Sequence, residues 1–314
     1  MPGPASWRPH AGCDSLKARA ALLAQLRLFF QQRSVLEVET PLLASATVTD
    51  PNIQPLACSD RWLQTSPEYA MKRLLAADSG PIYQICKAFR AGEAGASHNP
   101  EFTLLEWYRP GFELEQLIAE VAELVGRVLA REDYQVLTYR ELMQRYLQLD
   151  PFTAATGELE ATVRAQIEYG PGPETRDTWL DLIMTHLLQP QLAGTGLLFV
   201  RDYPASQAAL ARLRQDGEQL VAERFELYVD GVELANGYYE LNDAAEQRAR
   251  FLTDNEILVA RGEAARPLDE RLLDALASGL PACSGVALGV DRLLALQQDL
   301  PRLADGLSFA WSRS

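Results

Sequence analysis

The sequence lacks any apolar run of about 18 residues, the length that a membrane-spanning helix requires. Its first residues, MPGPASWRPHAG, also lack the apolar core of a secretory signal. Nothing in the sequence therefore directs the chain to a membrane, and we expect a cytoplasmic protein.

Cysteine is scarce and scattered. The four cysteines, Cys13, Cys58, Cys86 and Cys283, lie far apart and show no CxxC spacing. Zinc sites and disulfide frameworks both need cysteines at recurring short spacings. The sequence therefore indicates neither, and we expect free, buried thiols. The three histidines are equally dispersed.

Positive charge is also in short supply. The chain has 43 acidic residues against 29 lysines and arginines, for a formal net charge of -14, and contains no basic run. A protein that grips tRNA gains affinity by neutralising phosphates with basic side chains. Stable RNA binding is therefore disfavoured, whereas an acidic surface suits a protein partner that presents a lysine among basic neighbours.

Length and composition favour a single large domain spanning residues 1–314. With 47% hydrophobic residues, the chain can bury one large core or two modest ones. Residues 15–33 have apolar positions at helical spacing, with Ser15 as a candidate cap. The segment VLEVETP then alternates like a strand and stops at Pro41.

The middle of the chain changes from helical to strand patterns. We predict helices over residues 113–131, 139–147, 158–168 and 179–188, which together form a small helical insertion around 113–190. Residues 197–203 read as a strand. Residues 224–229 and 232–235 read as a hairpin joined by an Asp230-Gly231 turn, and residues 244–261 as a charged helix.

A first candidate site lies around Arg90. The segment YQICKAF before it has strand character, GEAGASHNP after it has the composition of a loop, and EFTLLEWY then returns to a strand. A fixed guanidinium beside a loop that folds over phosphates suits a nucleoside triphosphate. Arg90 is therefore our first catalytic candidate.

A second candidate site lies near the C-terminus, in SGVALGVDRLLAL. A strand of small residues leads to Gly289, and an Asp-Arg pair then opens an apolar helix. Gly289 allows a flat base to approach the backbone, and Arg292 can stack on that base or reach a terminal phosphate. Two separated arginines favour a bent triphosphate.

Taken in order, several segments resemble the lysyl branch of the class II aminoacyl-tRNA synthetases. These are LEVETPLL for the first motif, TSPEYAMKRLL, FRAGEAGASHNPEFTLLEWY for the second, ELANGYYEL, and GVALGVDR for the third. The resemblance implies an α+β fold with a class II catalytic core, a mainly antiparallel sheet flanked by helices. It also implies a homodimer built around the first motif.

Lysyl-tRNA synthetases carry an N-terminal oligonucleotide-binding barrel for the anticodon, whereas here the first motif helix begins at about Ser15. We therefore expect no such domain in this chain. In this it resembles the truncated lysyl synthetase paralogues that modify translation elongation factor P, the elongation factor P (R)-β-lysine ligase family. Ala287 agrees, since that family has alanine where lysyl synthetases usually have glycine.

The resemblance implies ATP as co-substrate with Mg²⁺. Arg90 would bind the α-phosphate and the carboxylate, Arg292 would lie near the γ-phosphate, and Glu233 with Glu240 would coordinate the metal. One departure concerns adenine: the place of the usual acid, two residues after the arginine, is Gly92 here and the acid is Glu93, so either Glu93 shifts into this contact or the backbone alone binds adenine. The full implied nucleotide set is Arg90, Gly92, Glu93, Asn99, Glu233, Leu234, Gly289 and Arg292.

On the substrate side, a diamino acid carries two ammonium groups that need compensating carboxylates. By the resemblance, Glu68 and Glu106 would hold the amino group nearest the carboxylate. The distant ammonium would be held by Glu240, Tyr108 and Asn236. The full implied substrate set is Ser66, Pro67, Glu68, Glu106, Tyr108, Asn236, Glu240 and Ala287.

These implications point to an ATP-dependent ligase that activates (R)-β-lysine or lysine as an adenylate and transfers it to a lysine ε-amino group of elongation factor P. One alternative is a minimal lysyl synthetase that charges tRNA or another carrier. A further alternative is a non-catalytic dimer that senses an amino acid, although retention of both arginines argues against a dead enzyme.

Overall fold

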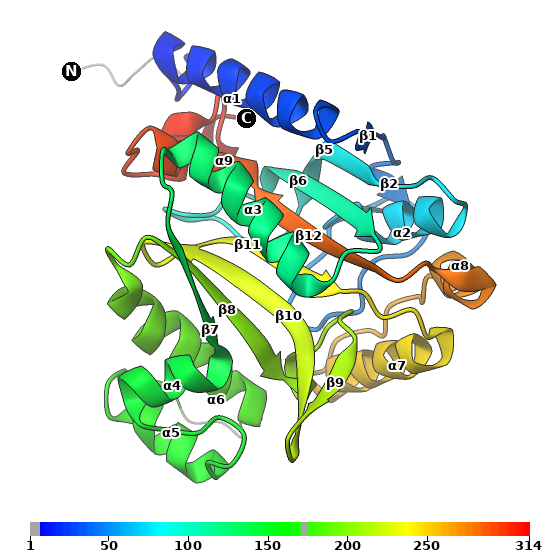
Figure 1. The fold of residues 1–314 in the computed structure, drawn as a ribbon, viewed down its shortest axis with the longest axis vertical. Coiled ribbons are helices and arrows are strands. Elements are labelled where there is room, and N and C mark those ends of the chain that lie inside the picture. The colour runs from blue at the N-terminus through cyan, green and yellow to red at the C-terminus, as the bar shows by residue number, and fades with distance from the viewer. Residues whose placement is uncertain (1–6, 171–174) are drawn as a thin grey trace.

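A computed structural model describes residues 7–170 and 175–314 of the chain. Its centre is a nine-stranded sheet with the order β1-β5-β6-β12-β11-β10-β8-β7, in which β9 pairs with β10 (Figure 1). The strands are β1 Leu36–Glu37, β5 Ile82–Phe89, β6 Glu101–Pro110, β12 Cys283–Gly289, β11 Val232–Tyr239, β10 Gln219–Val229, β8 Leu197–Pro204, β7 Tyr134–Thr138 and β9 Leu213–Asp216.

Most neighbours in this sheet are antiparallel, and the parallel pairs β1–β5 and β7–β8 lie at its two edges. The predicted α+β class with a mainly antiparallel sheet is confirmed. The predicted hairpin is also present, and it is longer than expected. Its turn residues Asp230 and Gly231 both have positive φ, 48° and 85°, as a two-residue hairpin turn requires.

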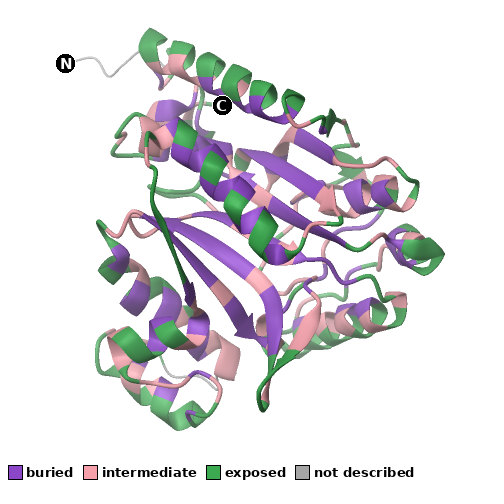
Figure 2. Ribbon diagram, viewed as in Figure 1, coloured by how far each residue is buried: buried purple, intermediate pink, exposed green. Residues whose placement is uncertain are grey.

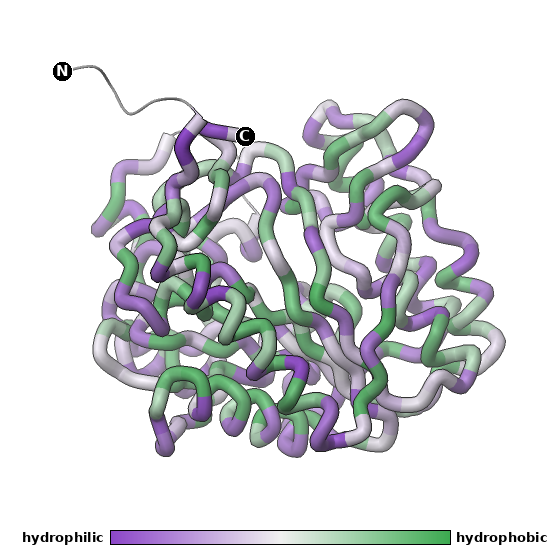
Figure 3. Tube along the Cα trace, turned by 90° about the horizontal axis from the view of Figure 1, so that it is seen from above, coloured by the Kyte–Doolittle hydropathy of each residue, from purple (hydrophilic) through white to green (hydrophobic). Residues whose placement is uncertain are grey.

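One face of the sheet is covered by α1 Cys13–Gln31, α3 Leu114–Leu129 and α9 Val290–Gln297, which enclose the largest core. Strand residues such as Leu105, Trp107, Phe225 and Leu227 point into it. Figure 2 shows the buried positions following the strands and the inner side of these helices. Along the helices, Figure 3 shows hydrophobic and hydrophilic positions in alternation, the pattern of half-buried helices.

On the opposite face, a helical layer packs over β8 and part of β10. It consists of α4 Tyr139–Leu147, α5 Thr156–Arg164, α6 Arg176–Leu182, the π-helical η1 Ile183–Leu188 and the 3₁₀ turn η2 Gln189–Leu192. Its core is separate from the first and includes Trp179 and Tyr139. The predicted insertion is therefore present with a later start, because α3 belongs to the main core. We interpret both layers as one domain, since one sheet supplies residues to both cores.

A third cluster borders the same face at the other end. Here α2 Glu68–Ala76, α7 Ala244–Ala260 and α8 Glu270–Gly279 pack together around Met71, Leu75 and Phe251. A small second sheet, β2 Leu43–Ala44, β4 Arg61–Leu63 and β3 Ala57–Cys58, precedes α2. Between this cluster and the helical layer, the sheet face stays open.

Two local predictions need correction. The first helix begins at Cys13 after Gly12, which makes no side-chain cap, so Ser15 lies inside the helix rather than capping it. The strand predicted in VLEVETP is only two residues long, Leu36–Glu37. No helix among residues 7–170 and 175–314 is long and apolar enough to cross a membrane.

The cysteine prediction was half right. All four thiols are free, in keeping with the expectation, but only Cys283 is buried. Cys13 and Cys58 are exposed and Cys86 is intermediate. The sequence shows no pattern at the two exposed positions that would have placed them at the surface.

Candidate active site

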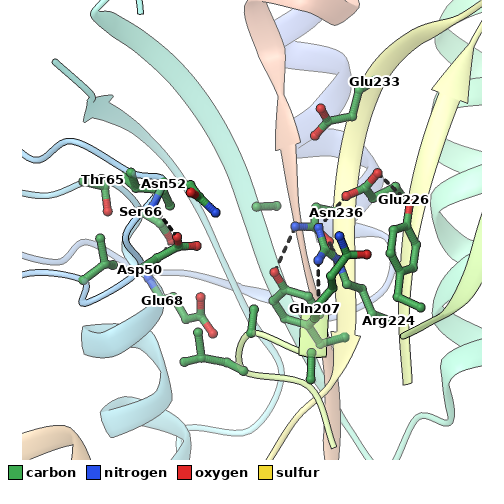
Figure 4. Close-up of a pocket in the computed structure, with 18 of the residues that line it drawn as sticks. Asp50, Asn52, Thr65, Ser66, Glu68, Gln207, Arg224, Glu226, Glu233 and Asn236 are labelled. Carbon is green, nitrogen blue, oxygen red and sulfur yellow. Dashed lines mark hydrogen bonds and ion pairs between the residues drawn. The ribbon is translucent and has the colours of Figure 1, made fainter. Parts of the chain in front are cut away.

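A cavity of about 940 Å³ lies on the open face of the sheet. Its floor is formed by β6, β12, β11 and β10, and its walls come from α2, α7 and the helical layer. Figure 4 shows Ser66 and Glu68 on one side of it and Arg224, Glu226 and Asn236 on the other, with Glu233 apart from both groups. This face of the sheet is apolar where the helical layer and the α2, α7 and α8 cluster cover it, and polar where it lines the cavity.

Strand register aligns the polar floor in two rows. Residues paired directly across antiparallel strands share a face. The first row runs through Glu106, Ala287, Asn236 and Glu226 on β6, β12, β11 and β10, and the second runs through Tyr108, Gly285, Tyr238 and Arg224. Four strands, from three separate parts of the sequence, therefore present their side chains to one surface.

A β-bulge brings Glu233 to the same surface. Leu227 pairs with Ala235, whereas the next residue, Tyr228, pairs with Glu233, so one residue of β11 is extra. Without the bulge, strict alternation would place Glu233 and Asn236 on opposite faces. With it, both line the cavity.

Arg90 lies at one end of the cavity, at the close of β5. Its guanidinium lies 5.1 Å above the ring of Phe102 and 3.7 Å from the Glu93 carboxylate, and its Nε has no hydrogen-bond partner among the described residues. Gly92 has a φ of +77° and does not line the cavity. Glu93 does line it, so the Glu93 carboxylate can reach an adenine ring bound in the cavity.

Arg292, at the start of α9, is held from two directions. Its guanidinium donates to the backbone oxygen of Glu233 at 2.7 Å, and it lies 2.7 Å from Nε2 of His98. Burial and the Arg292 charge lower the pKa of His98 below its usual value, which favours the neutral imidazole. The second and third motifs thus meet through this contact, which the sequence did not predict.

Asn99 holds the loop that follows Arg90. Its amide donates to the backbone oxygen of Glu101 at 2.5 Å and accepts from the backbone nitrogen of Trp311 at 2.9 Å. The residue therefore ties the loop to β6 and to the C-terminal segment. These contacts favour a role for Asn99 in holding the loop over a direct contact with the nucleotide.

At the other end of the cavity the acidic groups are buried. Glu106 is 2% exposed and accepts hydrogen bonds of 2.7 Å from both Ser66 and Tyr108. Burial, reinforced by the Glu68 charge, raises the pKa of Glu106 to about 7. Such a carboxyl group stands ready to ionise when a cation binds beside it.

Gly285 provides the space in which Tyr108 and Glu240 meet. A Cβ at this position would lie 2.3 Å from the Tyr108 ring and 2.6 Å from Oε1 of Glu240. No side chain fits within those distances, so only glycine permits this arrangement. Burial raises the pKa of Glu240, which is 2% exposed, to about 8.

A lysine that the sequence did not single out completes this end. Lys72 is 1% exposed, and its ammonium lies 2.7 Å from Glu68 and 2.5 Å from Glu240. Burial acts to lower the pKa of Lys72, but the charges of Glu240 and Glu68 outweigh it and raise that pKa above its ordinary value. Its spacing from Glu68, one helical turn, was the available signal.

The structure does not bring Glu233 and Glu240 together at one point, as a shared metal ion would require. They lie at opposite ends of β11, which spans Val232–Tyr239, so about 20 Å of extended backbone separates them. Glu240 is also engaged by Lys72. The carboxylate nearest to Glu233 in the floor is that of Glu226, which receives hydrogen bonds from Tyr203, Tyr228 and Arg224.

The remaining predicted residues can now be placed. Pro67 caps the start of α2 and, like Gly92, does not line the cavity. The predicted residues that do line it are Ser66, Glu68, Arg90, Glu93, Asn99, Glu106, Tyr108, Glu233, Leu234, Asn236, Glu240, Ala287, Gly289 and Arg292. Lys72, His98, Arg224 and Glu226 were missed.

Comparison with known proteins agrees with this geometry. The family model described as tRNA synthetases class II (D, K and N) matches residues 7–312. Similar proteins include those named elongation factor P (R)-beta-lysine ligase from Salmonella paratyphi B, Salmonella enteritidis and Salmonella typhimurium. Each is 45% identical over 322 residues, which cover 99% of this chain and 99% of the relative.

Proposed function

The chain belongs to the class II tRNA synthetases of the D, K and N type, and from this membership we propose that it is an ATP-dependent ligase of elongation factor P. It activates (R)-β-lysine, or lysine, as an adenylate and transfers the acyl group to a lysine ε-amino group of that factor. The observation that carries this proposal is the single cavity that joins an arginine-lined end to a buried acidic end.

The reaction has two steps. A carboxylate oxygen of the amino acid attacks the α-phosphorus of ATP, the bond to the β-phosphate oxygen breaks, and pyrophosphate leaves. The acceptor amine then attacks the carbonyl carbon of the adenylate, loses a proton and displaces AMP, leaving an amide bond. Neither step needs a protein nucleophile, so the enzyme orients the reactants and balances charge.

At the arginine-lined end, Arg90 holds the α-phosphate and the reacting carboxylate, and Arg292 holds the γ-phosphate. Both residues line the cavity, and Nε of Arg90 has no hydrogen-bond partner among the described residues. Glu93 lies beside Arg90 for the adenine, and Leu234 and Gly289 line the adjacent floor.

Mg²⁺ would supply charge compensation for the triphosphate. It often binds through one or two carboxylates together with substrate phosphates, and Glu233, whose side chain faces the cavity, fits that pattern. Among residues 7–170 and 175–314, no group of three or more His, Cys, Asp or Glu could hold a metal ion. We therefore expect Mg²⁺ to bind together with ATP rather than before it.

At the acidic end, the two ammonium groups of the diamino acid meet three carboxylates. Glu68 and Glu106 hold the amino group nearest the reacting carboxylate, and Glu240 holds the distant one. Tyr108 and Asn236 flank that path, and Ala287 lies between Glu106 and Asn236 in the floor. Glu106 and Glu240 are buried, so each carboxylate needs a cation beside it. A ligand whose ammonium groups pair with them is therefore favoured over one with a neutral group at the same place.

The proposal includes a homodimer and a cytoplasmic location. Large apolar side chains remain exposed on α1 and just after it, with Leu28 52%, Leu36 58% and Leu43 45% exposed. Contact with a second copy through this surface would bury them. Light scattering at micromolar concentration tests the dimer, and a monomeric mass would contradict it.

The function is tested by incubating the enzyme with ATP, Mg²⁺, (R)-β-lysine and elongation factor P, and measuring the intact mass of the factor. We expect one β-lysyl addition, which is lost when ATP or the amino acid is left out. An unchanged mass overturns the proposed transfer. Charging of tRNA by lysine without modification of the factor would favour the minimal synthetase, and absence of any amino-acid-dependent pyrophosphate exchange would favour the sensing dimer.

A further inference from the structure

Lys72 is a fully buried cation inside the acidic end of the cavity. It lies on α2, one turn after Glu68, and its side chain is 1% exposed. Burying an ammonium group is costly unless carboxylates compensate it. Two do so here, Glu68 at 2.7 Å and Glu240 at 2.5 Å.

The ammonium stands behind these carboxylates rather than in the space for a ligand. Glu68, Glu106 and Glu240 line the cavity, whereas Lys72 does not. Lys72 contacts Oε1 of Glu68 and Oε2 of Glu240. The other oxygen of Glu240, Oε1, lies over Gly285 on the cavity floor. One oxygen of each carboxylate therefore forms an ion pair with Lys72 on the protein side, and Oε1 of Glu240 remains for a ligand.

This arrangement also sets the charge of the pocket. Glu68, Glu106 and Glu240 contribute three carboxylates, and Lys72 contributes one ammonium. When bound ammonium groups keep all three carboxylates ionised, two negative charges remain after Lys72 is counted, and these equal the two ammonium groups of a diamino acid. Without Lys72, a buried carboxylate would have no counter-ion, and its cheapest response would be to keep its proton.

We propose that Lys72 is a positioning residue that determines specificity for a diamino acid, because it fixes the Glu68 and Glu240 carboxylates and keeps Glu240 ready to meet the distant ammonium. This role rests on the proposed function. It predicts that loss of Lys72 weakens recognition of the amino acid and leaves recognition of ATP intact.

The groups around Lys72 and Glu240 predict that KM for the amino acid depends on pH. Besides Glu68 on α2, the titratable groups around Glu240 are Glu106 and Tyr108 on β6, Tyr238 on β11 and Cys283 on β12. Burial raises the pKa of Glu240, and Lys72 is the largest influence that opposes this rise. Removing the ammonium must therefore raise the pKa of Glu240 further.

The test compares wild type, Lys72→Met, Lys72→Arg and the control Lys87→Met, whose partly exposed lysine pairs with Glu101 on the surface. Amino-acid-dependent pyrophosphate exchange gives KM for ATP, for (R)-β-lysine and for 3-aminohexanoic acid, which lacks the distant amine. For Lys72→Met we expect the preference for (R)-β-lysine over this analogue to fall at least about tenfold. We also expect the midpoint of its KM-pH profile to rise by about one unit, with KM for ATP unchanged.

Lys72→Arg, which keeps the charge, should retain most of the preference, and Lys87→Met should match the wild type. The preference and KM do not depend on how much enzyme is folded, so partial loss of folded protein does not obscure them. If the wild type is active and Lys72→Met has the same preference and KM-pH profile, the role of Lys72 is overturned and the proposed function stands. Equal rises of KM for ATP and KM for (R)-β-lysine in Lys72→Met lead to the same conclusion. A wild type without diamino-acid-dependent exchange overturns the proposed function as well.

Discussion

The two ends of the cavity are built differently. At the arginine-lined end the side chains are partly open to solvent, 28% exposed for Arg90 and 24% for Arg292, and 3.7 Å separates Arg90 from the Glu93 carboxylate. At the acidic end Lys72 and Glu240 are each 1% exposed and bound to one another. The charged groups are therefore partly exposed at the arginine-lined end, whereas at the acidic end they are buried in close ion pairs.

This difference suits the two ligands. A triphosphate brings several charges of its own and can order the arginines and the loop that includes Asn99 as it binds. A small amino acid offers few contacts, so discrimination must come from groups that are fixed beforehand. Mutations at the arginine-lined end should therefore affect the chemical step, whereas those at the acidic end should affect KM for the amino acid.

The largest effect is expected from Arg90→Ala. Removing a preorganised donor that faces developing charge should lower kcat for adenylate formation about 10³-fold. Pyrophosphate exchange measures it, with Arg61→Ala as the control, because Arg61 is exposed and pairs only with Asp60. A variant that keeps kcat and loses only affinity for the amino acid would contradict the division between the two ends.

Glu240→Gln should have the next largest effect. It removes the negative charge from a buried ion pair and leaves a neutral amide to meet the distant ammonium, so KM for (R)-β-lysine should rise about 100-fold while KM for ATP stays constant. Glu160→Gln is the matched control, since Glu160 forms a surface pair with Arg164 on α5. An equal rise in KM for ATP would show that the ends are not independent.

Gly285→Ala tests the close packing of the acidic end. Its Cβ would overlap the Tyr108 ring and Glu240, so we expect a loss of about 1–3 kcal/mol in the free energy of unfolding together with a raised KM for the amino acid. Gly157→Ala, where a Cβ meets nothing within 4 Å, should not destabilise the protein. Denaturant unfolding compares the two, and equal stability of both variants would refute the packing argument.

A smaller effect is expected from His98→Ala. This change removes one of the two contacts that orient Arg292 but leaves the backbone oxygen of Glu233. KM for ATP should rise about fivefold, as expected for roughly 1 kcal/mol of a lost hydrogen bond. Steady-state kinetics at varied ATP measures it. A change in KM for the amino acid instead would place His98 outside the nucleotide end.

The smallest effect concerns stability and pH. Burial raises the pKa of Glu106 to about 7 and of Glu240 to about 8, so the folded protein holds protons that the unfolded chain has released. Their contribution to stability is complete below the unfolded pKa of about 4.5 and disappears as pH rises through 7 to 8. The melting temperature should fall over this range, and the fall should be shallower in Glu106→Gln. An equal slope in both proteins would contradict the assignment.

Much of the arginine-lined end could be predicted from sequence, because its residues lie next to local signals. Arg90 ends a strand and precedes a polar loop, and Arg292 follows a glycine at the start of a helix. The hairpin that carries Glu233 was likewise marked by its Asp230-Gly231 turn. Short-range patterns suffice where the function depends on the ends of strands and helices.

The acidic end depended on long-range packing and could be predicted only in part. No local pattern shows that Lys72 turns inward toward Glu240, a residue that follows a different strand. No sequence pattern marks the bulge opposite Leu227 and Tyr228 either. This bulge brings Glu233 and Asn236 to one face of the sheet, on which Glu226 lies opposite Asn236.

The most direct test is a crystal structure with a non-hydrolysable analogue of β-lysyl adenylate. We predict that its phosphate analogue contacts Arg90 and that its distant ammonium lies within hydrogen-bond distance of Oε1 of Glu240, with Lys72 still behind that carboxylate. An analogue bound away from Arg90, or an ammonium that displaces Lys72 or points away from Glu240, would contradict the account.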